Sequence, residues 1–201
     1  MHLNSRRLFE KYLRRFFKSG MRVLEIGADA RAPYVFRDLV GDSSVQWDTL
    51  DIVPAFPGQT YVSANEYEFP VPDSCFDIVF SASVIEHVKK PWVWMRELSR
   101  VCKKDGHVLT IAPVSWTYHA VPFDCWRIFP EGMRALYEDA GMEMVLLESE
   151  SLEPTALPYC YPGRTHSTEA GLKGRLKLQI KKIIKWPVTY AVDTVGAGKK
   201  V

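Results

Sequence analysis

Residues 21–31, MRVLEIGADAR, constrain the fold more than any other stretch of the sequence. An apolar run from Val23 to Ile26 stops at Gly27, and a short polar loop follows. In an open α/β sheet, this pattern is typical of a buried first strand that leads into a ligand-binding loop. A second apolar run ends at Asp51, 24 residues after Gly27. That spacing predicts an acid that accepts both hydroxyls of a ribose.

The chain has 201 residues, 47% of them hydrophobic, which is enough for one domain with a core and too few for two generous ones. We therefore predict a single domain over residues 1–201. It divides into an N-terminal helix (1–20), a core (21–150), and a loop with a basic C-terminal helix (151–201). The four cysteines form no CxxC pair and the N-terminus lacks a secretory apolar core, which predicts reduced thiols in the cytoplasm.

The net charge of +2 is distributed unevenly along the chain. Residues 1–20 carry six Lys or Arg and one acid, and residues 164–201 carry nine and two. The residues between them carry 11 basic and 21 acidic side chains, so two basic arms flank an acidic body. The arms are either solvated faces of terminal helices or surfaces attracted to an anionic lipid or substrate.

Both arms contain amphipathic helical patterns. In residues 3–18, apolar residues recur at helical spacing among Lys and Arg, which predicts a helix that covers the sheet or the ligand cleft. From Leu172 to Lys185, a narrow apolar face is bordered by Lys, and Trp186 follows. This tail rests either on the domain's own surface or peripherally on the inner face of a membrane. No apolar run reaches the length of about 18 residues needed to span one.

Four stretches carry a family resemblance: VLEIGADARAP, LDIVP, NEYEFPVPDSCFDIVFSASVIEHV and LSRVCKKDGHVLTIAPV. In this order they resemble successive motifs of the class I S-adenosylmethionine-dependent methyltransferases, most closely the type 11 group. The resemblance covers roughly residues 20–150. It implies S-adenosylmethionine as cofactor and a Rossmann-like, doubly wound α/β fold, with a mostly parallel sheet and helices on both faces. The family usually adds a last antiparallel strand, but residues 152–171 contain three prolines, so we expect that strand to be shortened, irregular or missing.

The resemblance also implies a set of cofactor-binding residues: Glu25, Gly27, Asp29, Asp51, Ile52, Asn65, Glu66 and Ser81. Glu25 lies within the first strand, where a buried carboxylate needs a partner. The family's G-x-G-x-G loop keeps only Gly27 here, because Asp29 and Arg31 stand at the other glycine positions. We therefore expect a reshaped loop.

Two of these assignments have alternatives. Asn65 stands in the place of an acid that accepts from the adenine amino group, and its amide oxygen can do the same or can close an Asx turn. Asp51 is either the ribose ligand or a cap for the next turn, and Asp48 offers a competing register.

The catalytic candidates are His119, Asp124 and His87. The pair Glu86-His87 is predicted to begin a helical stretch that runs to about Val101. In the resembling group, this pair lies near the methyl-transfer cleft. Residues 115–129 form an aromatic loop that is either a substrate wall or a segment packed on the domain. A hydroxyl acceptor would use one of the three side chains as a base, whereas a carboxylate acceptor needs none.

These patterns favour a methyltransferase that acts on an oxygen or nitrogen of a small molecule. A glycan or glycolipid precursor is one such acceptor, because residues 123–142 resemble a segment of type 11 members associated with glycan assembly. A nicotinamide-dependent oxidoreductase would need glycines where Asp29 and Ala32 stand. The other alternative is a degenerate binding or partner protein without turnover. We expect no nucleic-acid partner and see no metal-ligand spacing among the five histidines; the oligomeric state is left open.

Overall fold

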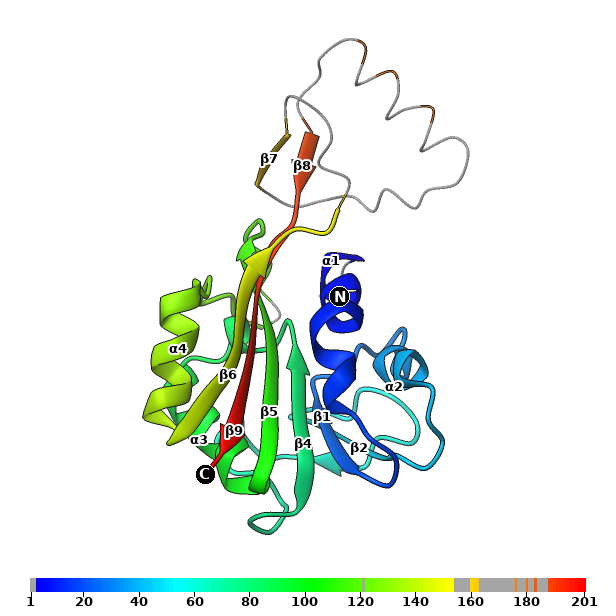
Figure 1. Cartoon of the computed structure of the whole chain (residues 1–201), viewed down its shortest axis with the longest axis vertical. Helices are drawn as coiled ribbons and strands as arrows, with labels where there is room; N and C mark the ends of the chain where they lie inside the picture. Colours follow the sequence, from blue (N-terminus) through cyan, green and yellow to red (C-terminus); the bar gives the residue numbers. More distant parts are fainter. Residues whose placement is uncertain are drawn as a thin grey trace.

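The structure is a computed structural model that describes residues 3–120, 122–153, 160–162, 176, 180, 183 and 188–201. Its core is a seven-stranded sheet in the order β3-β2-β1-β4-β5-β9-β6 (Figure 1). The strands are β1 Arg22–Ile26, β2 Gln46–Asp51, β3 Tyr61–Val62, β4 Phe76–Ala82, β5 Cys102–Ser115, β6 Met142–Glu150 and β9 Val192–Lys200. The strands from β3 to β5 pair in parallel, and β9 runs antiparallel to both neighbours. The predicted doubly wound α/β fold is confirmed.

The helices are α1 Leu3–Leu8, α2 Val35–Val40, α3 Pro91–Val101 and α4 Pro130–Asp139, with a 3₁₀ helix η3 at Ile85–His87. A separate pair of short strands, β7 Cys160–Pro162 and β8 Val188–Tyr190, lies apart from the sheet (Figure 1). Within the described residues, none of the helices is long and apolar enough to cross a membrane.

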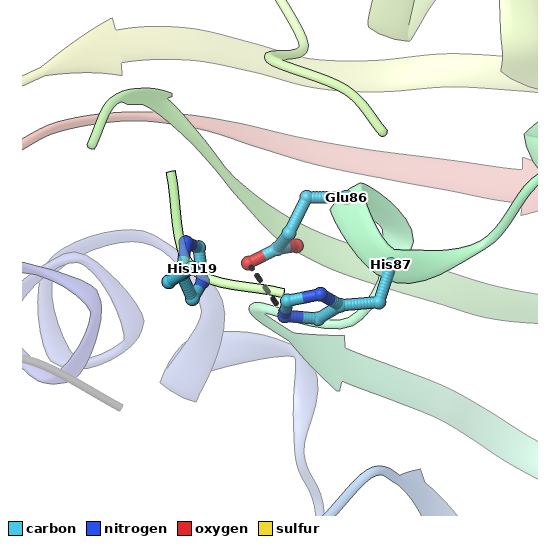
Figure 2. Close-up of side chains that lie close together, drawn as sticks. All are labelled: Glu86, His87 and His119. Atoms are coloured by element: carbon cyan, nitrogen blue, oxygen red, sulfur yellow. Dashed lines mark ion pairs between the residues drawn. The ribbon is translucent and has the colours of Figure 1, made fainter. Parts of the chain in front are cut away.

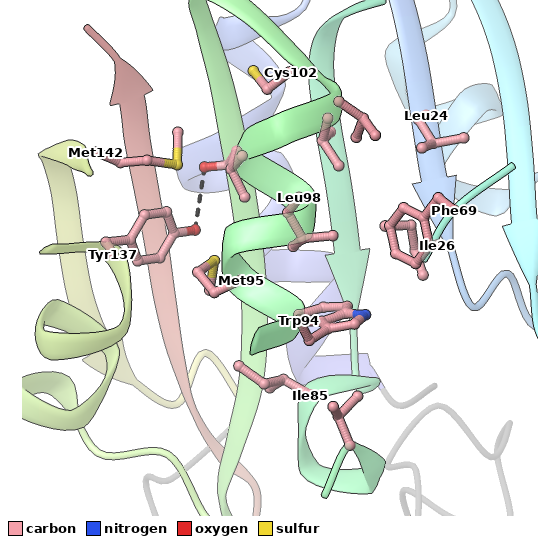
Figure 3. Packing of buried hydrophobic residues seen from close by; sticks show 14 of the residues in the cluster. Leu24, Ile26, Phe69, Ile85, Trp94, Met95, Leu98, Cys102, Tyr137 and Met142 are labelled. Carbon is pink, nitrogen blue, oxygen red and sulfur yellow. Dashed lines mark hydrogen bonds between the residues drawn. The ribbon is translucent and has the colours of Figure 1, made fainter. Parts of the chain in front are cut away.

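Alternate strand residues build two apolar cores, one on each face of the sheet. Leu24 and Val79 point to the face covered by α3 and α4, where Trp94 and Tyr137 are buried (Figure 3). Val23 and its same-face neighbours point to the opposite face, where α2 and the N-terminal helix pack. The sheet is therefore covered by helices on both sides, as the fold class requires.

The predicted N-terminal helix is present and covers the sheet. After α1 it continues as a π-helical turn, Phe9–Leu13, and a 3₁₀ turn, Arg14–Phe16. Phe9 is fully buried, and its ring lies 5.2 Å from that of Phe80 on β4. Buried Asn4 donates to Asp193 of β9 over 2.7 Å, which ties the helix to the far half of the sheet.

The expected continuous helix from Glu86 to Val101 is wrong, because two helices replace it. The 3₁₀ helix η3 ends at His87, and α3 begins only at Pro91. Proline disfavours the helical conformation in the residue before it, and Lys90 accordingly has φ −121° and ψ 75°. Proline itself suits the first helical position. This break separates the Glu86-His87 pair from α3.

The last antiparallel strand is present, and it comes from the end of the chain. The prediction that residues 151–201 form only a loop and a helix is therefore wrong for Val192–Lys200, which belong to the core sheet as β9. Two strand glycines, Gly196 and Gly198, make room for the buried Tyr137 of α4. The Tyr137 hydroxyl lies 3.0 Å from Thr110 Oγ1.

The predicted tail helix, Leu172 to Lys185, lies outside the described residues except at three positions. Leu176, Ile180 and Ile183 are helical, and all three side chains are exposed.

Gly198→Ala should destabilise the fold, because a Cβ there would lie 2.3 Å from Tyr137 Cδ1. Overpacking of this kind costs about 1–3 kcal/mol. Gly132→Ala, on α4, is the matched control, because a Cβ there meets nothing within 4 Å. It should stabilise the protein by about 0.4–1 kcal/mol. Urea unfolding measures both changes, and equal effects would refute the packing role of Gly198.

Candidate cofactor and acceptor site

The site begins at Gly27, where β1 ends. Gly27 has φ +72°, and its N–H donates to the Leu50 carbonyl over 2.9 Å. A Cβ at this position would lie 2.4 Å from Val84 Cγ2, in the segment that follows β4. Both the positive φ and this close approach require glycine.

The substituted positions of the loop do not require glycine. Within the described part of the chain, only Ser74, Ser83 and Asp105 combine a side chain with positive φ, so Asp29 and Arg31 adopt ordinary backbone conformations. Asp29 Oδ1 accepts the Arg31 N–H over 3.0 Å. Burial opposes ionisation of Asp29, but this hydrogen bond helps to hold its pKa below the usual value. The hydrogen bond from the Arg31 N–H to the Asp29 side chain thus stabilises the turn at the positions where the family has glycines.

Glu25 has the partner that its burial demands. Trp47 Nε1 donates to Glu25 Oε2 over 2.7 Å. Burial still raises the pKa of Glu25 to about 7, since the low dielectric disfavours the charged form. The carboxyl group lines a cavity of about 190 Å³, together with Gly27, Asp29 and Ser83.

A larger cavity of about 290 Å³ lies on the other side of Gly27. Asp51, Ile52 and Glu66, three of the predicted cofactor-binding residues, line it. Asp51 Oδ1 accepts the N–H of Ile52 over 2.6 Å, so this side chain caps the turn and also borders the cavity. Burial raises the pKa of Asp51. The competing residue Asp48 instead pairs with Arg22 at 2.8 Å.

Asn65 and Ser81 are not among the residues that line either cavity. Asn65 Oδ1 accepts the Tyr67 N–H over 2.7 Å, which is the alternative Asx turn. Ser81 is fully buried within β4. Ser83 lines both cavities instead, with φ +57° and no hydrogen-bond partner for its buried Oγ among the described residues. Ser81 and Ser83 are two positions apart, so the alternation of a strand predicts the same face for both. The sequence alone therefore could not show which of them lines the cavities.

The aromatic loop after β5 is both a wall and a packed segment. Phe123 lines the larger cavity, and its carbonyl oxygen lies 2.5 Å from His87 Nδ1. Trp126 Nε1 donates to the Val88 carbonyl over 2.9 Å, and the Cys125 N–H donates to the Glu86 carbonyl over 2.7 Å. These bonds fasten the loop to η3 at the edge of the cavity.

The structure gives Asp124 a supporting role beside His119. Arg127 donates to both oxygens of the buried Asp124 carboxylate, at 2.5 and 2.8 Å. This guanidinium holds the pKa of Asp124 far below its usual range, which makes it a poor base. Burial lowers the pKa of His119, whose Nδ1 lies 3.0 Å from the Thr117 carbonyl and 3.2 Å from Asp124 Oδ2. The ring is thus neutral near pH 7 and held in one orientation.

His119 and His87 lie together, although 32 residues separate them in the chain. Their ring centroids are 5.0 Å apart, and His87 lines the larger cavity. Beside them lies Glu86, whose buried side chain is 1% exposed (Figure 2). Burial raises the pKa of Glu86 to about 8. Glu86 is a site residue that the sequence analysis did not select, because an acid on a short helix gives no signal of burial.

The strand order, the glycine turn and the acid at the end of β2 define a Rossmann-like, nucleotide-type binding domain. A family model described as a methyltransferase domain matches residues 11–110, about half of the chain. By fold and sequence, the chain belongs to the class I S-adenosylmethionine-dependent methyltransferases, in the type 11 group. The predicted family is confirmed.

Individual relatives agree with this family. An uncharacterised methyltransferase of Mycobacterium tuberculosis is 38% identical over 72 residues, which are 35% of this chain and 27% of that protein. The match thus spans about a quarter of the relative's length. A SAM-dependent methyltransferase from Archaeoglobus fulgidus aligns with a TM-score of 0.61 and 18% identity, over 98% of this chain and 95% of that one. The [4+2]-cyclase SpnF aligns with a TM-score of 0.63 and 16% identity, over 97% and 81%.

The residues present fit the family's cofactor, S-adenosylmethionine. The cradle at Gly27 would be filled by a Cβ, and carboxylates lie on both sides of it, Glu25 in one cavity and Asp51 in the other. Asp51 can accept from ribose hydroxyls, while Glu25 and Asp29 can face the positively charged amino-acid end. Ser83, with its unpartnered hydroxyl, joins the two cavities.

Asp51→Ala should weaken the binding of S-adenosylmethionine, because each hydrogen bond to a charged group contributes about 1.5–3 kcal/mol. Isothermal calorimetry on the purified chain measures the change. Asp48→Ala, three positions earlier on β2, should leave the affinity unchanged, because Asp48 pairs with Arg22. If Asp51→Ala binds as tightly as the wild type, the ribose contact lies elsewhere.

Proposed function

We propose that this chain transfers a methyl group from S-adenosylmethionine to an oxygen or nitrogen of a small-molecule acceptor. One observation carries the proposal: a single cavity is lined both by Gly27 and Asp51 and by His87 and Phe123. The first pair suits a nucleoside, and the second pair offers a base and an apolar wall. The cavity can therefore hold a cofactor and present its reactive group to a second molecule.

The chemistry makes modest demands on the protein. S-adenosylmethionine supplies an activated methyl group when it is bound. The side chains of the site need to align an acceptor lone pair with that group and to exclude water. Phe123 and Val88 supply apolar walls to the cavity, and the hydrogen bond from Trp126 to Val88 holds the loop closed over them.

A hydroxyl acceptor also needs a base, for which two histidines are suitable. His87 Nδ1 faces the Phe123 carbonyl, so in the neutral ring the lone pair is on Nε2. His119 lies behind His87 and is held by Asp124. We assign His87, which lines the cavity, to the removal of the acceptor proton, and we assign His119, whose ring lies against that of His87, and Asp124 to positioning.

The acceptor that fits this wall carries a ring with an apolar face, such as a sugar of a glycan or glycolipid precursor. Exposed aromatic side chains gather on the loop and on α3: Trp92, Tyr118, Phe123, Trp126 and Phe129. The rings of Trp92 and Trp126 lie 6.3 Å apart. Large aromatic surfaces of this kind, exposed beside a cavity, mark a binding surface.

His119→Ala should lower turnover by up to roughly a hundredfold, because it removes the ring that positions the base His87. Its affinity for the cofactor should stay near that of the wild type, because His119 lines neither cavity. Transfer of labelled methyl groups to glycolipid, metabolite, protein and RNA fractions identifies the acceptor and measures the rate.

His107→Ala is the control for this experiment. His107 lies on β5, away from the site, and its ring packs against that of Phe16 in the N-terminal helix. Full activity of His119→Ala would leave His87 as the base or indicate a carboxylate acceptor. Cofactor binding without transfer to any fraction would favour a binding protein that lacks turnover.

We further propose that the C-terminal segment brings the site to an anionic membrane surface, on the inner face. Leu176, Ile180 and Ile183 share one helical face and are 63%, 50% and 79% exposed. Because these apolar side chains face solvent, they are available to insert into a lipid interface. The sequence places Lys177, Lys181 and Lys182 between them, and each Lys near an anionic leaflet contributes about 1 kcal/mol.

Co-sedimentation with vesicles tests this proposal. The wild type should pellet with anionic vesicles at low salt, and less at high salt or with neutral vesicles. Ile183→Glu should release it, since it removes apolar burial worth about 1.5–3 kcal/mol and adds a repelled charge. Val145→Glu, which replaces another exposed apolar residue on β6, should still pellet. Absence of the wild type from anionic pellets at low salt would refute the membrane contact.

A further inference from the structure

Three side chains of the kind that bind metals converge behind the acceptor wall. Glu86, His87 and His119 each place one ligand atom within 4.8 Å of the other two (Figure 2). Glu86 and His87 come from η3, and His119 comes from the loop after β5. The fold therefore brings two distant segments together into a candidate metal-binding cluster, which the spacing of the histidines in the sequence did not predict.

The charge of Arg127 compensates the burial of the Glu86 carboxyl group only in part. Neither of its oxygens has a hydrogen-bond partner in the described part of the chain. His87 Nε2 is 3.9 Å from Glu86 Oε1, too far for a hydrogen bond. Arg127, the nearby cation, donates instead to Asp124 and to backbone carbonyls. A carboxyl group buried in this way either stays protonated or is stabilised as an anion by a cation beside it, and a metal ion held by the two histidines would be such a cation.

The two imidazoles are oriented as metal ligands are. A carbonyl oxygen can only accept, so the contact of His87 Nδ1 with the Phe123 carbonyl places the proton on Nδ1. His119 Nδ1 likewise faces the Thr117 carbonyl and Asp124 Oδ2. Each neutral ring therefore keeps a lone pair on Nε2. Metal-bound histidines usually show this arrangement, in which the other nitrogen donates to a carbonyl or a carboxylate.

We propose that Glu86, His87 and His119 bind one divalent transition-metal ion of the Zn²⁺ type. Two imidazole nitrogens and one carboxylate oxygen suit Zn²⁺ better than Mg²⁺ or Ca²⁺, which prefer oxygen ligands. With bonds of about 2.0–2.1 Å, tetrahedral ligand atoms lie about 3.3 Å apart. The 3.9 Å between His87 Nε2 and Glu86 Oε1 therefore needs to close by only about half an ångström on binding.

Metal binding would add a new element to the acceptor end of the cavity. Three protein ligands leave the fourth position of a tetrahedral ion open, as in catalytic zinc sites. His87 also lines the cavity, so the ion borders the space where the acceptor binds. There it would bind an acceptor oxygen and lower its pKa, which would replace proton removal by the Nε2 atom of His87, because the ion occupies that lone pair. This last role rests on the proposed methyl transfer, whereas the binding of the ion does not.

Calorimetric titration of the chelator-treated full chain with zinc chloride tests the site. The expected stoichiometry is one ion per chain. Loss of an outer-shell group typically costs 10–100-fold in affinity, so Glu86→Gln and His119→Ala, which remove direct ligands, should each cost at least about 100-fold. His107→Ala removes a histidine outside the cluster and should bind zinc as the wild type does. Titration with Co²⁺ should produce visible absorption bands of a tetrahedral site, which Glu86→Gln should lose.

Circular dichroism and the binding of S-adenosylhomocysteine accompany each variant. Glu86→Gln should fold, because the amide has the same size and removes a buried charge, and His119→Ala gives an independent test if it does not. The absence of zinc binding to the wild type overturns the proposal, as does equal zinc affinity in folded variants. Zinc binding without methyl transfer supports the metal site and counts against the proposed function. Methyl transfer by a chain that binds no zinc supports the proposed function and overturns the metal site.

Discussion

The close approach of Gly27 to Val84 is the constraint on which the site depends. The strand order reverses between β1 and β4, so the segments that leave these strands diverge and open a crevice at their carboxyl ends. Gly27 turns the chain with a positive φ and carries no side chain that would push Val84 away. Gly27 and Ser83 line both cavities, so the two cavities meet where these segments come close.

Two buried carboxylates lie around this crevice, and both reduce the stability of the unliganded protein. Burial raises the pKa of Glu25 to about 7 and that of Glu86 to about 8, because the interior disfavours their charged forms. Trp47 offsets part of this cost for Glu25, whereas Glu86 has no hydrogen bond in the described part of the chain. Conflicts of this kind, between a local rule and the fold, are expected at functional sites. A positively charged ligand beside either group would relieve this cost, as in the binding proposed above.

The rest of the molecule holds these groups in position. The N-terminal helix packs Phe9 against Phe80 and binds Asp193 through Asn4, which covers one face of the sheet. On the opposite face, Tyr137 of α4 packs against the glycines of β9. The same fold occurs in a protein described as a cyclase. The function of this chain therefore depends on its side chains, among them the histidine pair with Glu86.

Local chemistry made part of this structure predictable from the sequence alone. The apolar run before Gly27, the acid at Asp51 and the order of the motifs indicated the fold and the nucleoside end of the cavity, because these signals depend on residues adjacent in the chain. Three features depended on contacts between distant segments. The strand β9 was not predicted, because glycine is unfavourable in a strand and the need for it here comes from Tyr137, which packs on Gly196 and Gly198 from α4. Ser83 lines the cavity and Ser81 does not, because the backbone turns with positive φ at Ser83. His119 joins Glu86 and His87 only because the loop after β5 folds back onto η3, a closure fixed by backbone hydrogen bonds that sequence spacing does not encode.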